Sequence, residues 1–70
     1  MVTTVDARGL ACPLPLALAK ARITQVAPGQ RLMVLADDPE APLDLAAWCA
    51  EEGHSLSQEG VEFTILRAST

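Results

Sequence analysis

The sequence is poor in aromatic residues, and this limits how its interior can be packed. Trp48 and Phe63 are the only members of the Phe, Trp and Tyr group among 70 residues. Half of the residues are nevertheless apolar. Aliphatic side chains and alanine must therefore form most of the core. A chain of this length buries only about 60% of the surface that it exposes when unfolded, so we expect one domain over residues 1–70.

Basic residues are also scarce, with five against nine acidic residues and a formal net charge of -4. No two of the basic residues are adjacent; they are Arg8, Lys20, Arg22, Arg31 and Arg67. Proteins that bind nucleic acids usually carry a basic stripe or patch. We therefore expect no direct nucleic-acid partner.

No long apolar run is present. The longest, Leu10–Ala19, is interrupted by two prolines, whereas a membrane helix needs about 20 apolar residues. The segment Met1–Asp6 has neither a basic start nor an apolar stretch, so it does not resemble a secretory signal. We expect a cytoplasmic protein without membrane contact, in which Cys12 and Cys49 are free thiols.

Motifs for metals and phosphates are missing as well. Structural zinc sites need four ligands, usually in close pairs, and this chain has two distant cysteines and one histidine. It has no Cys-x-x-Cys pair for dithiol chemistry and no glycine-rich phosphate loop. We expect no metal and no cofactor.

The order of apolar segments and turn residues predicts β-α-β-α-β-β. Expected strands are Thr3–Asp6, Arg31–Ala36, Ser55–Gln58 and Val61–Leu66, and expected helices are Cys12–Val26 and Pro42–Glu52. The first two strands should be parallel with a right-handed crossover, and the last two should form a hairpin. The predicted fold is an α/β (α+β) two-layer sandwich, with both helices on one face of a mixed four-stranded sheet.

Periodicity also predicts which side of each helix is buried. The expected core face of the first helix is Leu16, Ala19, Ile23 and Val26. That of the second helix is Leu43, Ala46, Ala47 and Ala50.

The segment Cys12-Pro13-Leu14-Pro15 carries the strongest chemical signal. With Cys12 as the N-cap, both prolines fall in the first helical turn, where a missing N–H removes no helical hydrogen bond. Cysteine is a poor N-cap, which suggests a reactive thiol. A helix N-terminus stabilises a thiolate, so we expect a lowered pKa for Cys12 if the helix N-terminus governs it. The alternative is a small buried residue that happens to begin a helix.

The segment Asp6-Ala7-Arg8-Gly9-Leu10-Ala11-Cys12-Pro13-Leu14-Pro15 resembles the signature of the TusA/SirA-like sulfur carriers, whose hallmark is Cys-Pro-x-Pro. The similarity continues through Pro28-Gly29, Asp37-Asp38-Pro39, Asp44, Trp48-Cys49 and Gly53-His54. It implies the same two-layer sandwich and a persulfide carried on Cys12. In this reading Gly9, Leu10, Pro13 and Pro15 support the motif.

The resemblance implies a sulfurtransferase-type carrier that works with partner proteins. Cys12 would accept sulfane sulfur from a cysteine desulfurase or a rhodanese-like donor and relay it to an acceptor protein, in tRNA thiolation, cofactor thiolation or sulfur metabolism. We expect a monomer that forms transient complexes. The alternative is a non-catalytic interaction or regulatory module in which the motif serves only as a rigid cap.

Several other residues have two interpretations. Cys49 is either an inert buried thiol, which its mid-helix position favours, or a resolving cysteine for Cys12. His54 is either a structural residue, the favoured interpretation, or a base. Asp37 and Asp38 either form a turn and N-cap the second helix, or act together in partner docking. Their charge would oppose a thiolate on Cys12, and Arg8 would either offset that charge or remain solvated.

A second row of apolar residues runs along the first helix. Leu14, Leu18 and Ala21 lie nearly opposite its expected core face, at spacings that place them in a line. Apolar residues in a row on a solvent-facing side often mark a contact site. The row is therefore either a docking site next to Cys12 or ordinary surface.

Overall fold

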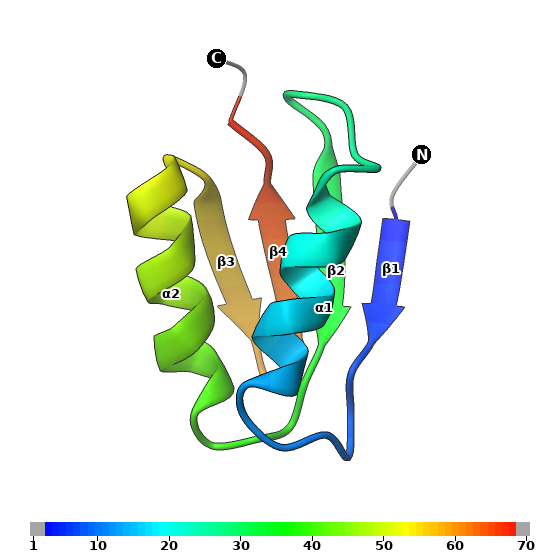
Figure 1. Ribbon diagram of the computed structural model, residues 1–70, viewed down its shortest axis with the longest axis vertical. Coiled ribbons are helices and arrows are strands. Elements are labelled where there is room, and N and C mark those ends of the chain that lie inside the picture. The colour runs from blue at the N-terminus through cyan, green and yellow to red at the C-terminus, as the bar shows by residue number, and fades with distance from the viewer. Residues whose placement is uncertain (1–2, 69–70) are drawn as a thin grey trace.

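The computed structural model describes residues 3–68, so Met1 and Val2 of the segment compared above with a secretory signal lie outside the described residues. Its elements follow the predicted order (Figure 1). They are β1 (Thr3–Asp6), α1 (Leu14–Ile23), β2 (Arg31–Leu35), α2 (Ala41–Glu52), β3 (Ser55–Glu59) and β4 (Glu62–Leu66). Neither described helix is long and apolar enough to cross a membrane.

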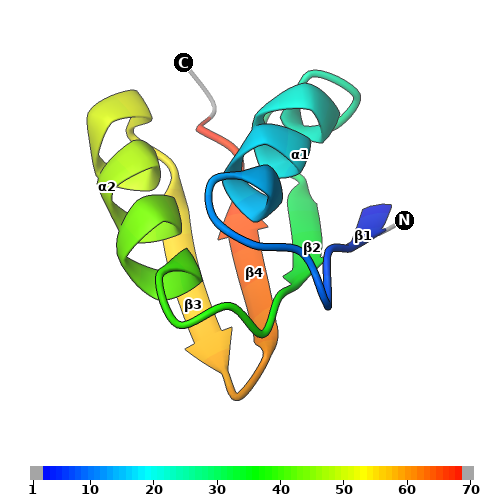
Figure 2. The same ribbon diagram turned by 60° about the horizontal axis from the view of Figure 1, so that its bottom comes forward.

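The sheet has the order β1-β2-β4-β3, with β1 parallel to β2 and the other neighbours antiparallel. Both helices lie on one face of this mixed sheet (Figures 1 and 2). The predicted two-layer α/β sandwich is therefore confirmed. The strands alternate as a half-buried sheet requires: Val5, Val34 and Phe63 lie side by side and are buried under the helices.

Helix α1 begins two residues later than predicted. The N-cap is Pro13 (φ −99°, ψ 21°), not Cys12. The Pro13 carbonyl accepts the first helical hydrogen bond, from Ala17 N–H at 2.9 Å, while Leu14 N–H closes a turn onto the Ala11 carbonyl at 2.9 Å. The chain before Leu14 is therefore a turn, and Cys12 belongs to the loop that precedes the helix.

The other end of α1 is also shorter than predicted. After Ile23 the chain tightens into turns, in which Gln25 and Val26 donate to carbonyls three residues earlier. Val26 is still buried, as are Ala19 and Ile23, whereas Leu16 is half-buried. The predicted core face of α1 is thus largely correct.

The predicted core face of α2 is wrong. The buried residues are Ala41, Leu45, Trp48 and Cys49, and none of the four predicted residues is buried. Leu43 is 69% exposed. The apolar residues of α2 fit two helical faces, and the face with Leu45 and Trp48 removes larger side chains from water than the alanine face does. Gly53, at φ 78°, ends the helix as predicted.

The corrected face of α2 makes a stability prediction. Leu45→Ala should lower the free energy of unfolding by about 2–5 kcal/mol, because Leu45 is fully buried and its removal leaves a cavity. Leu43→Ala, two residues away on the exposed side, should change it by no more than about 0.5 kcal/mol. Urea unfolding followed by circular dichroism measures both. Equal losses would show that the helix is rotated from the position described.

Candidate functional site

Cys12 lies in the loop between β1 and α1, and its side chain is exposed. Since β1 and β2 are parallel, their carboxyl ends meet at one edge of the sheet. The loops that follow them, residues 7–13 and 36–40, therefore lie next to each other (Figure 2). The first turn of α2 begins at the same edge. Open α/β sheets commonly place ligand and reaction sites at such an edge.

Two aspartates connect these loops. Asp37 Oδ1 accepts the backbone N–H of Gly9 at 2.9 Å, and Asp38 Oδ2 accepts the backbone N–H of Cys12 at 3.2 Å. The other Asp38 oxygen accepts Glu40 N–H at 2.8 Å. The two side chains thus hold the Cys12 loop in place. One interpretation predicted that these aspartates cap α2. That prediction is wrong, because the N-cap of α2 is Glu40.

A third carboxylate contacts the sulfur itself. Cys12 Sγ donates to Asp44 Oδ2 at 2.6 Å. Asp44 lies in the first turn of α2 and is half-buried. In the sequence, Asp44 is part of the family resemblance only, and no role was expected for it. Its acidic side chain one turn into a predicted helix was the available signal, but nothing in the sequence placed that turn beside Cys12.

The surroundings of Cys12 disfavour its thiolate. The pKa of this thiol rises from 9.0 to about 11, first because of the hydrogen bond to Asp44, then through partial loss of hydration and the negative charges of Asp44, Asp38 and Glu40. The expectation of a lowered pKa is therefore wrong. Because α1 begins at Leu14, Cys12 lies outside the helix, and a carboxylate at hydrogen-bond distance outweighs the helix dipole.

Arg8 pairs with Asp6 and not with the acids near the sulfur. Its guanidinium donates twice to the Asp6 carboxylate, at 2.9 Å each. This contact lowers the pKa of Asp6 to about 2. Both side chains are more than half exposed. The positive charge of Arg8 is thus paired with Asp6, two residues away. No described hydrogen bond or ion pair joins Arg8 to Cys12.

The residues expected to support the motif differ in burial. Gly9 has φ 81°, a left-handed conformation that favours glycine in the turn after β1. Leu10 packs against the core, and Pro15 is buried in the first turn of α1. Pro13 is exposed. The loop is therefore anchored on both sides of the sulfur.

The predicted apolar row on α1 is only partly exposed. Leu14 is 50% exposed and Ala21 is exposed, but Leu18 is half-buried and packs against the core. The expectation that Leu18 faces solvent is therefore wrong. Helix α1 contacts α2 as well as the sheet. It therefore buries side chains on more than the one face that is turned toward the sheet.

Cys49 and His54 serve the packing of the molecule. Cys49 is buried, its thiol is free, and burial raises its pKa. His54 Nδ1 accepts the backbone N–H of Ala68 at 2.8 Å, and the imidazole packs edge-on against Trp48 with ring centres 5.3 Å apart. Asp44 lies in the first turn of α2, whereas His54 follows Gly53 beyond the last turn of that helix, so the two are at opposite ends of α2. These contacts confirm its structural interpretation.

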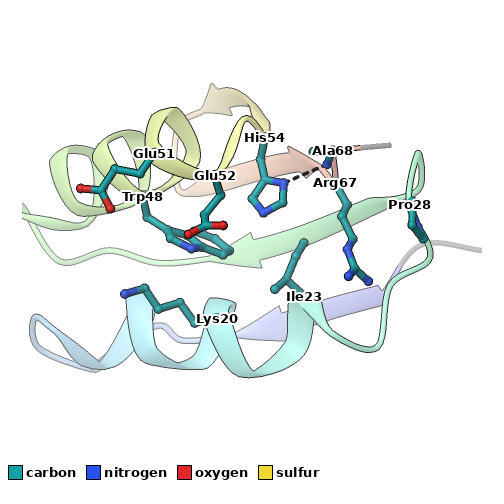
Figure 3. A pocket seen from close by; sticks show the side chains of 9 residues that line it. All are labelled: Lys20, Ile23, Pro28, Trp48, Glu51, Glu52, His54, Arg67 and Ala68. Atoms are coloured by element: carbon teal, nitrogen blue, oxygen red, sulfur yellow. Dashed lines mark hydrogen bonds between the residues drawn. The ribbon is translucent and has the colours of Figure 1, made fainter. Parts of the chain in front are cut away.

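A depression of about 590 Å³ lies between the later turns of the two helices (Figure 3). Its walls include Lys20, Ile23, Trp48, Glu52, His54 and Arg67. Within residues 3–68, no group of three or more His, Cys, Asp or Glu side chains is arranged to hold a metal ion. Cys12 is not among the residues that line this depression.

Known proteins resemble this chain over most of its length. Residues 3–67 match the family model described as sulfurtransferase TusA. The chain is 45% identical over 67 residues to a protein of Neisseria meningitidis serogroup A and to one of serogroup B, each named a putative sulfur carrier protein, with 90% of this chain and 89% of the relative covered. A Bacillus subtilis protein with the same description, YrkI, is 41% identical over 63 residues, covering 90% of this chain and 84% of its own. The chain belongs to the TusA family of sulfurtransferases.

Proposed function

We propose that this protein carries sulfane sulfur as a persulfide on Cys12 and relays it between partner proteins. The observation that carries the proposal is the position of Cys12: an exposed thiol on a loop held by Asp37 and Asp38, in a chain of the TusA family. The names of its relatives, which describe sulfur carriers, support the same role. Cys49 is buried and cannot meet a partner's sulfur without local unfolding.

The transfer needs only thiol and persulfide groups. The thiolate of Cys12 attacks the terminal sulfur of a donor persulfide, so that one S–S bond forms at Cys12 while the S–S bond of the donor breaks. The donor cysteine leaves as a thiolate, and no net oxidation or reduction takes place. Release is the same reaction with Cys12 as the donor. An acceptor thiolate attacks the terminal sulfur, the S–S bond to Cys12 breaks, and Cys12 leaves as a thiolate.

The donor in this proposal is a cysteine desulfurase or a rhodanese-like protein, and the acceptor is a protein of tRNA thiolation, cofactor thiolation or sulfur metabolism. Such a carrier works as a monomer with transient complexes in the reducing cytosol, where its thiols stay free. A small contact area suits a protein that must release each partner.

One observation favours a second candidate function, a non-catalytic interaction module. The hydrogen bond to Asp44 and the pKa of about 11 make Cys12 less reactive than an ordinary thiol at neutral pH. A module without persulfide chemistry would show no reactivity at this cysteine. Loading with sulfur decides between the two functions.

The carrier function predicts that loading depends on Cys12 alone. After incubation with a protein persulfide donor, the intact mass of the parent protein and of the Cys49→Ala variant should increase by one sulfur atom. Cys12→Ser should show no such gain, while circular dichroism shows an unchanged fold. Loading of Cys12→Ser equal to that of the parent would refute the assignment, and absence of loading in all three proteins would favour the interaction module.

Docking should use the exposed apolar side chains around the sulfur. Leu14 is two residues from Cys12 and is 50% exposed, and Leu43 is next to Asp44 and is 69% exposed. Both flank the Cys12–Asp44 contact at the starts of α1 and α2. Leu18 contributes less than its sequence position suggests, because it is half-buried.

Leu14→Ser should therefore slow sulfur handover to a protein acceptor several-fold, because the partner loses apolar contact beside the sulfur. Loading from a small-molecule donor should not change. Leu66→Ser is the matched control, since Leu66 is also an exposed leucine, 38% accessible, at the far end of β4. The docking assignment is wrong if the two variants hand over sulfur at equal rates.

A further inference from the structure

In the hydrogen bond between Cys12 and Asp44, the thiol is the donor and the carboxylate is the acceptor. A thiol can donate one hydrogen bond and an ionised carboxylate can only accept, so the 2.6 Å contact exists only while Sγ carries its proton. Asp44 approaches from α2, 32 residues away in sequence, and its own backbone N–H is bonded to the Glu40 carbonyl at 3.0 Å. The carboxylate is therefore fixed by the helix and not by the loop that carries the sulfur.

Resting on the proposed carrier function, we propose that Asp44 keeps Cys12 protonated in the free carrier, which restrains the capture of sulfur, and that its negative charge disfavours the departure of Sγ as a thiolate, which restrains the loss of sulfur. Asp44 is a restraining residue for the reaction, and it acts directly on the reacting atom. Without such a restraint, an exposed thiolate would react with any disulfide or persulfide in its surroundings.

The charged groups that act on the Cys12 sulfur all disfavour its thiolate. From the loop after β2, Asp38 and Glu40 add negative charge, and from α2, Asp44 does so at hydrogen-bond distance. The loop that carries Cys12 offers one cation, Arg8, which is paired with Asp6. Among the described residues, no positive group is identified as favouring the thiolate of Cys12. Removal of the nearest carboxylate should therefore have the largest effect.

The restraint applies in both directions of transfer. In capture, the attacking species is the Cys12 thiolate, which the carboxylate disfavours. In loss, a thiolate attacks the terminal sulfur, the bond between that sulfur and Cys12 Sγ breaks, and Sγ leaves as a thiolate that then takes a proton from water. A thiol of higher pKa leaves more slowly. Asp44 thus makes the loaded carrier more resistant to small thiols.

A purely structural contact makes different predictions. If Asp44 only tethers the Cys12 loop, its replacement should lower stability without changing the pH dependence of the thiol. Asp44→Asn separates the two roles, because asparagine keeps the size and an oxygen acceptor but removes the charge. Glu52→Gln is the matched control: it removes one charge from the last turn of the same helix, at the depression distant from Cys12.

The first experiment measures the rate of Cys12 alkylation by iodoacetamide from about pH 6 to about pH 9.5 in a Cys49→Ala background. The parent rate should rise about tenfold per pH unit through pH 9 without reaching a plateau, since the pKa is about 11. Asp44→Asn should be faster at neutral pH, by roughly threefold to fourfold for each unit by which the pKa falls. Glu52→Gln should match the parent.

Two results would overturn the proposal. One is a parent rate that levels off with a midpoint at or below about pH 8.5, the behaviour of an unrestrained thiol; this measurement needs no replacement of Asp44 and stands even if Asp44→Asn does not fold. The other is an Asp44→Asn variant, folded by circular dichroism, whose profile equals that of Glu52→Gln. Asp44→Glu, which restores a carboxylate on a longer side chain, should return the rate toward that of the parent.

The second experiment follows the loaded carrier. Parent and Asp44→Asn proteins carrying persulfide are mixed with excess glutathione, and the loss of one sulfur atom is followed by intact mass. The variant should lose its sulfur several-fold faster, and equal rates would contradict the restraint on the leaving sulfur. Alkylation involves no sulfur transfer, so a carrier that never loads would disprove the proposed function while leaving the proton restraint measurable.

Discussion

The parallel pairing of β1 with β2 determines where every other part of the site lies. Asp6 pairs with Leu35 at the end of this ladder, and the next residue, Ala7, donates to the Leu35 carbonyl at 2.7 Å. Both strands therefore end at the same edge of the sheet, and the two loops that follow them must run side by side. The aspartates of one loop can then accept the backbone N–H groups of the other. An antiparallel pair would have placed these loops at opposite edges.

The sulfur consequently sits where two electrostatic influences compete. The N-terminal end of α1 favours negative charge, but it begins at Leu14, beyond the sulfur. The carboxylates that organise the loop and begin α2 lie closer and disfavour it. The same acidic side chains that give the loop its shape therefore limit the nucleophilicity of the thiol. Structure and reactivity are coupled at this edge, because Asp38 both anchors the backbone of Cys12 and adds negative charge near its sulfur.

Much of the fold follows from local sequence signals. Strand alternation, the glycine at the end of α2 and the turn before β4 predicted the element order, and the Cys-Pro-x-Pro segment predicted the position of the exposed thiol. These features depend on neighbouring residues in the chain. The start of α1 was misplaced because a cysteine before a proline fits both an N-cap and a turn, and the choice depends on which carbonyl accepts the first helical bond.

The errors that matter for chemistry involve distant residues. The buried face of α2 was ambiguous because alanine fits either side of a helix, and only packing on the sheet selects Leu45 and Trp48. The contact of Asp44 with Cys12 depends on that rotation and on the parallel strands together. No periodicity in one segment encodes it. The sign of the pKa change at Cys12 could therefore not be obtained from the loop sequence.

The packing of Trp48 against His54 gives the protein a natural optical probe. Trp48 is the only tryptophan in the chain, and it lies on the same helix as Asp44, about one turn further along. The imidazole of His54 packs edge-on against the indole ring, so the fluorescence of Trp48 reports on the position of the chain around the end of α2. A partner without tryptophan that docks over Cys12 and displaces this helix would reveal itself in the emission of the carrier, without any label at the reactive thiol.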